Sequence, residues 1–249
     1  MTISAAVQSI SGQKLQSEPI SGVDVVGLSR QIVLVLCENW DSTNGWLRRF
    51  DLEESDWKLS APPTRVSLGR NGLAWGRGVQ PPQEGLQKKE GDGRSPAGIF
   101  PLPYVFGKAS LDEVKGIRVP YVQCTASLEC VDDTNSTYYN QIIDRTSVSD
   151  PDWHSSEKML TVSDEYRLGV VVEQNIPPHA GAGSCVFLHV WGAKLKTTSG
   201  CTAMPLGELE ALVAWMDHSA LPILVQLPHA EYVRCKGPWR LPEIPSSSP

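Results

Sequence analysis

The sequence contains no long apolar run, no block of cationic residues and no C-x-x-C pair. Its longest apolar stretches, residues 32–37 and 223–227, are far shorter than the about 20 residues of a membrane-spanning helix. A net charge of −6 at pH 7 without a Lys/Arg cluster argues against a nucleic-acid partner. The cysteine spacing argues against a zinc knuckle, and no glycine-rich loop between a strand and a helix supports nucleotide binding. We therefore expect no nucleic acid, no membrane span and no metal.

The composition instead predicts a mainly β protein. The chain has 249 residues, of which 41% are hydrophobic and 20% charged, and glycine and proline are plentiful. Val, Ile, Thr and Trp recur in short runs, which favours strands and turns. We expect a polar N-terminal arm over residues 1–29, one domain over 30–241 and a flexible Pro/Ser tail over 242–249. Because no secretory segment follows Met1, the protein is either not exported or shown in a mature form.

Apolar runs with β-branched residues predict the strands, and one helical pattern stands out. We expect residues 64–68 and Leu73–Trp75 to form a hairpin across Gly-Arg-Asn-Gly, and a short helix over 157–160. The clear helix covers residues 205–218, where apolar side chains recur at helical spacing. The other predicted strands are Gln31–Cys37, the end of the segment 89–100, and residues 117–124, 138–143, 167–174, 185–190 and 221–227.

Of the six cysteines, Cys201 has the least core-like neighbours. A disulfide between Cys124 and Cys130 that closes a β-hairpin is one option in an oxidising compartment, whereas Cys37 and Cys185, set in apolar strands, are predicted to be buried core residues. Residues 198–202, Thr-Ser-Gly-Cys-Thr, precede the predicted helix. A thiol ahead of a helix start is favoured as thiolate by the backbone N–H groups and the helix dipole.

His189 ends a predicted strand twelve residues before Cys201 and is the candidate base. N–H groups near Gly200, Cys201 and Thr202 are candidate donors to an oxyanion. The simpler alternative is a structural histidine beside an unreactive cysteine, because a His and a Cys at this spacing are a weak signal alone.

The wider pattern resembles the L,D-transpeptidase catalytic domain family, the YkuD-like domain. Members carry a histidine, a short loop and a Ser/Thr-x-Gly-Cys signature, here His189 and residues 198–201. Upstream, residues 91–100 (GDGRSPAGIF) look like the GDG-(K/R)-(S/T)-P-x-G-x-F stretch of the family. The order and separation of the motifs also match, over about residues 30–228. Many members have His at the position of Ser199 and Arg at that of Ala203, so this chain looks like a divergent branch.

The resemblance implies a β-sandwich domain with one main helix after the nucleophile. It implies a Cys201 thioester with peptidoglycan stem peptides (muropeptides), resolved by an amine as an L,D-transpeptidase or by water as an L,D-carboxypeptidase. It also implies acylation by carbapenems, no metal or organic cofactor, and a periplasmic or cell-envelope location. Nucleophile and base carry over to Cys201 and His189, whereas the usual substrate-binding arginine does not.

Five further residues are candidates for substrate binding. Trp191 is expected to form a wall of the groove, and Trp153, Ser156 and Glu157 a lid in which the carboxylate recognises a diamino-acid amine. Arg94 is the candidate for a substrate carboxylate. For each, the alternative is an ordinary half-buried or turn residue.

Two other classes of function remain open from the sequence. One is a catalytically silent peptidoglycan-binding module, and the other is a structural secreted protein whose cysteines are all paired. A papain-like protease is disfavoured because there the nucleophile usually precedes the histidine.

Overall fold

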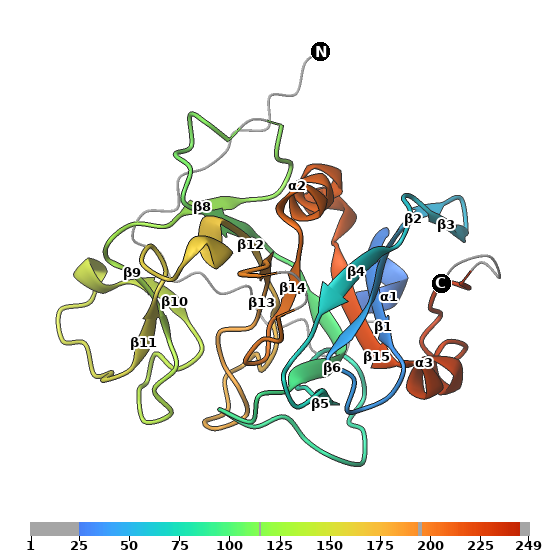
Figure 1. Cartoon of the computed structure of the whole chain (residues 1–249), viewed down its shortest axis with the longest axis horizontal. Helices are drawn as coiled ribbons and strands as arrows, with labels where there is room; N and C mark the ends of the chain where they lie inside the picture. Colours follow the sequence, from blue (N-terminus) through green and yellow to red (C-terminus); the bar gives the residue numbers. More distant parts are fainter. Residues whose placement is uncertain (1–24, 115, 194–195, 245–249) are drawn as a thin grey trace.

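A computed structural model of the protein describes residues 25–114, 116–193 and 196–244 (Figure 1). It is mainly β, as predicted, and the helix expected after Cys201 is present as α2. The strands are β1 (Gln31–Cys37), β2 (Asn44–Glu53), β3 (Asp56–Leu59), β4 (Thr64–Ser67), β5 (Leu73–Trp75), β6 (Ser95–Pro101), β7 (Val105–Gly107), β8 (Tyr121–Gln123), β9 (Leu128–Val131), β10 (Ile142–Asp144), β11 (Ser156–Lys158), β12 (Leu168–Val171), β13 (Phe187–Val190), β14 (Thr202–Met204) and β15 (Ile223–Pro228). The helices are α1 (Val25–Leu28), α2 (Leu206–Trp215) and α3 (His229–Cys235), with 3-10 turns η1 (Arg145–Ser147), η2 (Asp164–Arg167) and η3 (His218–Ala220).

Twelve strands form one mixed sheet in the order β5-β6-β15-β1-β2-β4-β14-β13-β12-β7-β8, with β3 paired to β2. β1 lies between β15, which is parallel to it, and β2, which is antiparallel. All seven residues of β1 are buried, which explains its unbroken apolar sequence.

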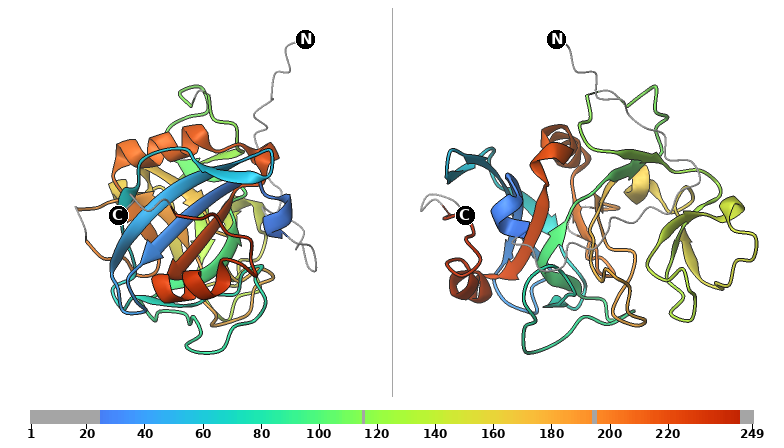
Figure 2. Two further views of the ribbon diagram at one scale, coloured as in Figure 1. Left: turned by 90° about the vertical axis from the view of Figure 1, so that its right-hand side faces the viewer. Right: turned by 180° about the vertical axis from the view of Figure 1, so that it is seen from behind.

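The two halves of this sheet face a common core. Ile32 and Leu34 of β1 belong to the same cluster of buried side chains as Leu188 of β13 and Met204 of β14. Leu209 of α2 joins this cluster, and α2 packs on β12 and β13. In Figure 2, α2 and α3 lie at opposite ends of the strands around β1 and β15. The sheet thus closes over its core as a sandwich would.

A three-stranded sheet, β10-β9-β11, stands beside the large one (Figure 1). A disulfide joins Cys130 of β9 to Cys185, two residues before β13. The prediction of a Cys124–Cys130 disulfide is therefore wrong, whereas Cys185 is buried as predicted, with its sulfur bridged to Cys130. Cys124 has a free, buried thiol, and its N–H donates to Gly107 at the end of β7 (2.7 Å). The strand pairing that carries Cys130 away from Cys124 is not visible in the sequence.

Two other local predictions are corrected by strand pairing. β4 and β5 do not form a hairpin, because β4 pairs with β2 and β14 while β5 pairs in parallel with β6. The short helix expected over residues 157–160 is absent, since β11 pairs with β9 and places Glu157 opposite Cys130. In both cases a distant strand supplies the hydrogen bonds that a local structure would have made.

The expected arm and tail are described only in part. Residues 25–28 of the arm form α1, and Val26 packs into the core. In the tail, the Pro242 carbonyl accepts from the Tyr232 hydroxyl (2.7 Å), and Ile244 packs against the core. Residues 1–24 and 245–249 lie outside the described residues.

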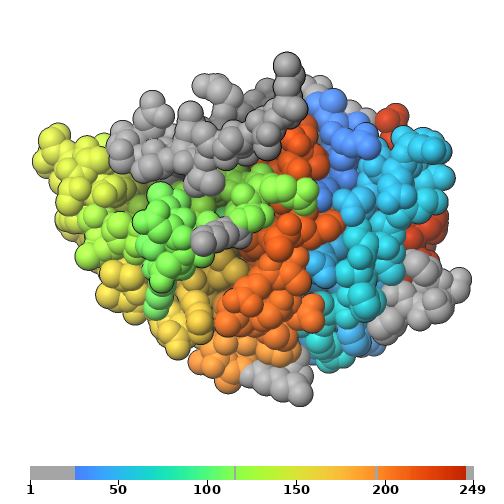
Figure 3. Space-filling model, turned by 90° about the horizontal axis from the view of Figure 1, so that it is seen from above, coloured from blue at the N-terminus to red at the C-terminus, as the bar shows by residue number. Residues whose placement is uncertain are grey.

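Seen from above, the orange segment that includes α2 lies between the green segment around β7 and β8 and the cyan β2–β3 hairpin (Figure 3). Leu209, Leu212 and Val213 are the side chains with which α2 covers the core. Burial stabilises each by about 1.5–3 kcal/mol relative to an exposed position. In the described part of the chain, no helix is long and apolar enough to cross a membrane.

We expect replacement of Cys130 and Cys185 together by alanine to lower the free energy of unfolding by about 2–4 kcal/mol. The reason is that the bridge closes a loop with a sequence separation of 55 residues in the unfolded chain. Urea denaturation measures the change. Wild type treated with reductant should match the double variant, which should itself not respond to reductant. A wild type that keeps its urea midpoint after reduction would contradict this expectation.

Candidate functional site around Cys201 and His189

The parallel pairing of β13 with β14 brings Cys201 and His189 to one face of the sheet. Leu188 is registered with Thr202, so Cys201 lies beside Phe187. Side chains alternate along a strand, and Phe187, His189 and Cys201 therefore share a face. Leu188 and Met204 point into the main core on the other side, whereas Cys201 packs against the second buried cluster, which contains Phe187. We call the side of β13 and β14 that carries Phe187, His189 and Cys201 the thiol face.

His189 is held in one tautomer by a backbone contact. Its Nδ1 lies 2.8 Å from the carbonyl oxygen of Val190, which can only accept, so Nδ1 carries the proton. Nε2 of the neutral ring then has a free lone pair. The ring is buried and packs edge-on against Tyr166, with centroids 5.7 Å apart. Burial lowers the pKa of His189, which favours the neutral imidazole that a general base requires.

The Cys201 thiol is half-buried and neutral in this state. Its Sγ donates to the Cys185 carbonyl (3.5 Å) and accepts from the Phe187 N–H (3.3 Å). Burial, followed by the charge of Glu157, raises the pKa of the thiol to about 12. Among the described contacts, no hydrogen bond joins Cys201 to His189. The thiol and the imidazole are thus neighbours on one face, but not a preformed ion pair.

The sequence argument that placed Cys201 at a helix start is wrong. β14 lies between Cys201 and α2, so the first turn of α2 and its dipole are a strand away from the thiol. The dipole effect falls off within the first turn of a helix and does not reach Cys201. Instead, Cys201 lies directly before the first residue of β14.

The turn before Cys201 is held by Thr198. Its Oγ1 donates to the Cys201 carbonyl (2.6 Å) and accepts from the Gly200 N–H (3.1 Å), so this predicted oxyanion donor is already engaged. Ser95 of the glycine-rich motif also donates to the Cys201 carbonyl (3.1 Å). The two sequence motifs therefore meet at the backbone of Cys201.

Ser199 and Thr202 have partners away from the thiol. Ser199 Oγ accepts from the exposed Arg70 guanidinium (3.0 Å). Thr202 Oγ1 donates to the Gln226 side chain of β15 (2.7 Å), on the opposite side of the sheet. Their side chains support the loop and the strand, respectively.

Glu157 is linked to His189 through Tyr166. Its carboxylate accepts a short hydrogen bond from the Tyr166 hydroxyl, and the Tyr166 ring packs on His189. Burial raises the pKa of Glu157 to about 7, with further increases from Asp132 and Glu90. Strongly shifted pKa values are common at functional sites. Through Tyr166, the shifted carboxyl of Glu157 is connected to the thiol face.

The other members of the predicted lid are turned elsewhere. Trp153 Nε1 and Ser156 Oγ both donate to the buried Glu129 carboxylate, at 2.7 and 2.6 Å. Lys158 forms an ion pair with the same carboxylate. Burial would raise the pKa of Glu129, but these partners lower it to about 2. Trp153 and Ser156 therefore stabilise the small sheet and do not line the thiol face.

Arg94 is not directed at Cys201 either. Its guanidinium donates to the Leu73 carbonyl (3.0 Å) and pairs with Asp41 at 3.6 Å. Trp191 follows β13, and its N–H continues the ladder to the Met204 carbonyl (2.8 Å). The alternation of β13 continues the thiol face towards Trp191, whose buried Nε1 has no hydrogen-bond partner among the described residues. The role of Trp191 as a wall of the groove stays a prediction, whereas the Arg94 guanidinium is bound away from Cys201.

Sequence reasoning missed Lys88. The residue is buried, and its Nζ forms an ion pair with Asp92 of the glycine-rich motif at 2.5 Å. A Cβ placed on Gly200 would lie 3.8 Å from this Nζ, so the ammonium stands beside the residue that precedes Cys201. The four-residue spacing from Lys88 to Asp92 was the visible signal, but outside a helix such spacing has no fixed meaning.

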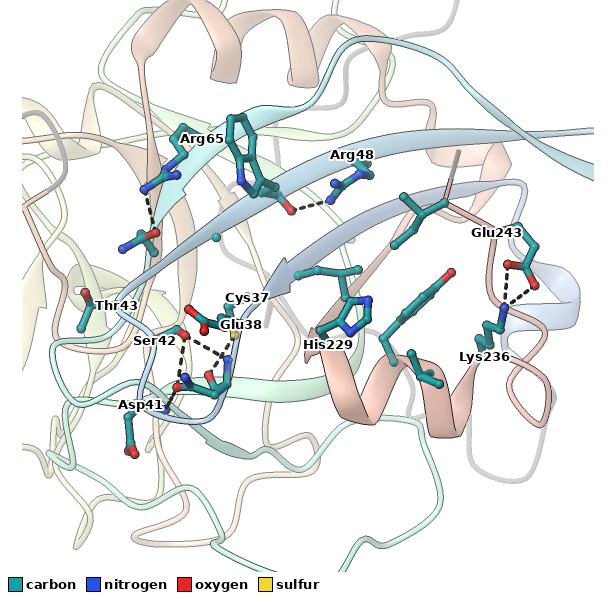
Figure 4. Close-up of a pocket in the computed structure, with 18 residues that line it drawn as sticks. Cys37, Glu38, Asp41, Ser42, Thr43, Arg48, Arg65, His229, Lys236 and Glu243 are labelled. Atoms are coloured by element: carbon teal, nitrogen blue, oxygen red, sulfur yellow. Dashed lines mark hydrogen bonds and ion pairs between the residues drawn. The ribbon is translucent and has the colours of Figure 1, made fainter. Parts of the chain in front are cut away.

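A second Cys–His neighbourhood exists at the far end of β1. Cys37 and His229 line a hollow of about 1080 Å³ bounded by β1, β2 and α3 (Figure 4). The buried Cys37 thiol donates to the Asn39 carbonyl (3.2 Å), and burial raises its pKa to about 12. His229 is exposed and packs on Tyr232, with ring centroids 6.2 Å apart. Cys37 ends β1 and His229 begins α3, so no strand register places them on one face as it does Cys201 and His189, and the Cys201 region is the better candidate.

Within the described residues, no group of three or more His, Cys, Asp or Glu side chains is arranged to hold a metal ion. The cysteines are not all paired, because four of the six have free thiols. This contradicts a structural protein in which every cysteine is bridged.

Comparison with known proteins gives one distant likeness. No protein-family model and no curated protein matches the chain. The crystal structure of the helical cell shape determining protein Pgp2 from Campylobacter jejuni aligns with a TM-score of 0.38 and 14% identity over 80% of this chain. The alignment covers 48% of that protein, so the present chain spans about half of its length. A likeness of this size makes no statement about activity.

The raised pKa of the thiol predicts slow alkylation at neutral pH. At about pH 8, iodoacetamide should modify Cys201 at least about tenfold more slowly than a free cysteine, because the thiolate is the reactive form. Peptide mapping by mass spectrometry measures the rate at Cys201, with the urea-unfolded protein as control. Fast alkylation that is independent of pH near neutrality would instead reveal a preformed thiolate–imidazolium pair.

Proposed function

We propose that the protein is a cysteine-dependent acyltransferase that acts on peptidoglycan stem peptides, with Cys201 as nucleophile and His189 as base. The observation that carries the proposal is their placement on one face of two paired strands, with His189 Nδ1 committed to the Val190 carbonyl. That contact leaves Nε2 as the basic atom. The choice of substrate rests on the two sequence motifs, which the fold brings together at the Cys201 backbone.

The proposed reaction has two steps. His189 Nε2 takes the thiol proton while Cys201 Sγ attacks the carbonyl at the L-centre of a stem peptide. The peptide C–N bond then breaks, the terminal D-amino acid leaves with the proton from the imidazolium, and a thioester remains. An amine acceptor that resolves the thioester gives a crosslink or an exchanged D-amino acid, and its proton returns to His189. Water in place of the amine gives L,D-carboxypeptidase activity.

The neutral resting state fits this sequence of events. The pKa of Cys201 is raised and that of His189 is lowered, so proton transfer is unfavourable before a substrate is bound. A carbonyl carbon beside Sγ makes transfer productive, because the negative charge passes on to the carbonyl oxygen. The thiol is thereby protected from side reactions until an acyl donor arrives.

A catalytically silent peptidoglycan-binding module is the second candidate. The observation that favours it is the neutral Cys201 thiol without a hydrogen bond to His189. A location in the cell envelope belongs to both proposals, and the Cys130–Cys185 disulfide supports an oxidising compartment.

Incubation with disaccharide-tetrapeptide muropeptides, resolved by mass, tests the proposal. We expect wild type to release the terminal D-alanine and Cys201→Ala to lose at least about a thousandfold in rate, since the covalent step has no other nucleophile. Cys235→Ala removes a buried thiol from α3 and is the matched control. Dimers or exchanged D-amino acids indicate transfer, and tripeptide alone indicates hydrolysis. Intact substrate with wild type would reject the enzyme for this substrate and favour the binding module.

Carbapenems provide an independent prediction. If Cys201 performs acyl transfer, its sulfur should open the β-lactam ring and the intact protein should gain the mass of one carbapenem. Cys201→Ala should gain none, and His189→Ala should react at least about a hundredfold more slowly because it lacks the base. Active wild-type protein that shows no adduct would remove carbapenems from the ligands of this site.

A further inference from the structure

The charges that face Cys201 oppose a thiolate. Glu157 of β11 and Glu165 of η2 both raise the pKa of the thiol through their negative charge. The two titratable rings in the same surroundings, Tyr166 and His189, are buried, and burial favours their neutral forms. Negative charge on sulfur or on a substrate oxygen therefore needs a cation to balance these carboxylates.

Lys88 supplies that cation from a distant part of the chain. Its side chain is only 5% exposed and lies against two glycines that leave room for it. A Cβ on Gly183 would lie 3.1 Å from Lys88 Cγ, and one on Gly200 would lie 3.8 Å from Lys88 Nζ. The ammonium thus occupies space that side chains at these two positions would contest, beside the backbone leading into Cys201.

Asp92 fixes the ammonium without fully neutralising it. The same carboxylate accepts from the Lys89 N–H (2.8 Å) and the Arg94 N–H (2.9 Å), so its charge is shared among several donors. Lys88 Nζ also donates to the Lys89 carbonyl (2.9 Å). These contacts account for two of the three ammonium protons and hold the charge in one place.

We propose that Lys88 is a positioning residue whose ammonium, held by Asp92 beside Gly200, stabilises the negative charge that develops at Cys201. It acts through the field at the sulfur, in surroundings where burial weakens screening by solvent. The role in catalysis rests on the proposed acyl transfer, whereas the effect on the thiolate does not. Asp92 of the glycine-rich motif thereby holds the Lys88 ammonium near Cys201, although Lys88 and Cys201 are far apart in the sequence.

The rival explanation is that Lys88 and Asp92 only pack the loop. A packing role predicts that loss of either group lowers the melting temperature and leaves the intrinsic reactivity of the thiol unchanged. A charge role predicts that loss of the cation and loss of the carboxylate change thiol reactivity in opposite directions. Alkylation by iodoacetamide separates the two, because the thiolate displaces iodide to form a thioether while its proton goes to solvent.

The experiment measures the alkylation rate of Cys201 between about pH 7 and 10, with peptide mapping, in full-length protein. We expect Lys88→Met to slow alkylation at about pH 9 by about tenfold, as for loss of one nearby opposite charge. Lys88→Arg keeps the charge and should stay within about threefold of wild type. Asp92→Asn should accelerate alkylation by about threefold or more. The control is Glu129→Gln, which removes a carboxylate of the small sheet bound by Lys158 and Trp153.

Folded Lys88→Met with a rate within about twofold of wild type would overturn the proposal. If Lys88→Met does not fold, Asp92→Asn decides, and a rate equal to or below wild type would overturn it. Muropeptide turnover is measured in parallel. A shifted alkylation rate without turnover in wild type leaves the thiolate effect standing and rejects the acyl transfer. Turnover without any shift in alkylation retains the acyl transfer and rejects the role of Lys88.

Discussion

The hydrogen-bonded register between β13 and β14 determines the rest of the site. Because Leu188 is paired with Thr202, the Cys201 thiol and the His189 imidazole lie on the same side of β13 and β14. A shift by one residue would turn His189 or Cys201 into the main core. The register is secured from behind, where Gln226 of β15 accepts from Thr202 (2.7 Å) and donates to the Pro96 carbonyl (2.8 Å). A buried glutamine thus couples the nucleophile strand to the glycine-rich motif.

Buried aromatic rings and a few charged side chains surround the Cys201 thiol. Glu157 and Tyr166 bring a carboxyl and a phenol close to His189, and Lys88 approaches from the other motif. Preorganised charges of this kind act most strongly where water is excluded. Burial and the charge of Glu157 explain why the resting thiol stays protonated.

The sequence was most informative where a pattern is local. β1 and α2 follow from an apolar run and from helical spacing; β1 is present as predicted, and α2 is present but ends at Trp215, before the predicted end at residue 218. β14 was missed because three residues next to a helix carry no strand periodicity of their own. The disulfide partner of Cys130 was missed because it depends on how the small sheet docks.

At the site, the family resemblance indicated Cys201 and His189, and the structure adds their common face. The substrate-binding candidates fared less well because the direction of a side chain is set by its nearest partners. Trp153 and Ser156 donate hydrogen bonds to the buried Glu129 carboxylate, and no sequence motif indicates this pairing. Lys88 was invisible for the related reason that its environment is assembled from Asp92, Gly183 and Gly200, which are far apart in the chain.

The position of β15 has a consequence for how the chain acquires its fold. β15 is the last strand along the described chain, yet it lies inside the sheet, between β6 and β1. Until it is inserted, β1 and β6 each present an unpaired edge, and Thr202 lacks its partner Gln226. Synthesis from the N-terminus therefore leaves these edges open until β15 has emerged, and open strand edges favour aggregation. The surroundings of Cys201 are therefore complete only after β15 has joined the sheet, although the motif that carries the thiol is synthesised before it.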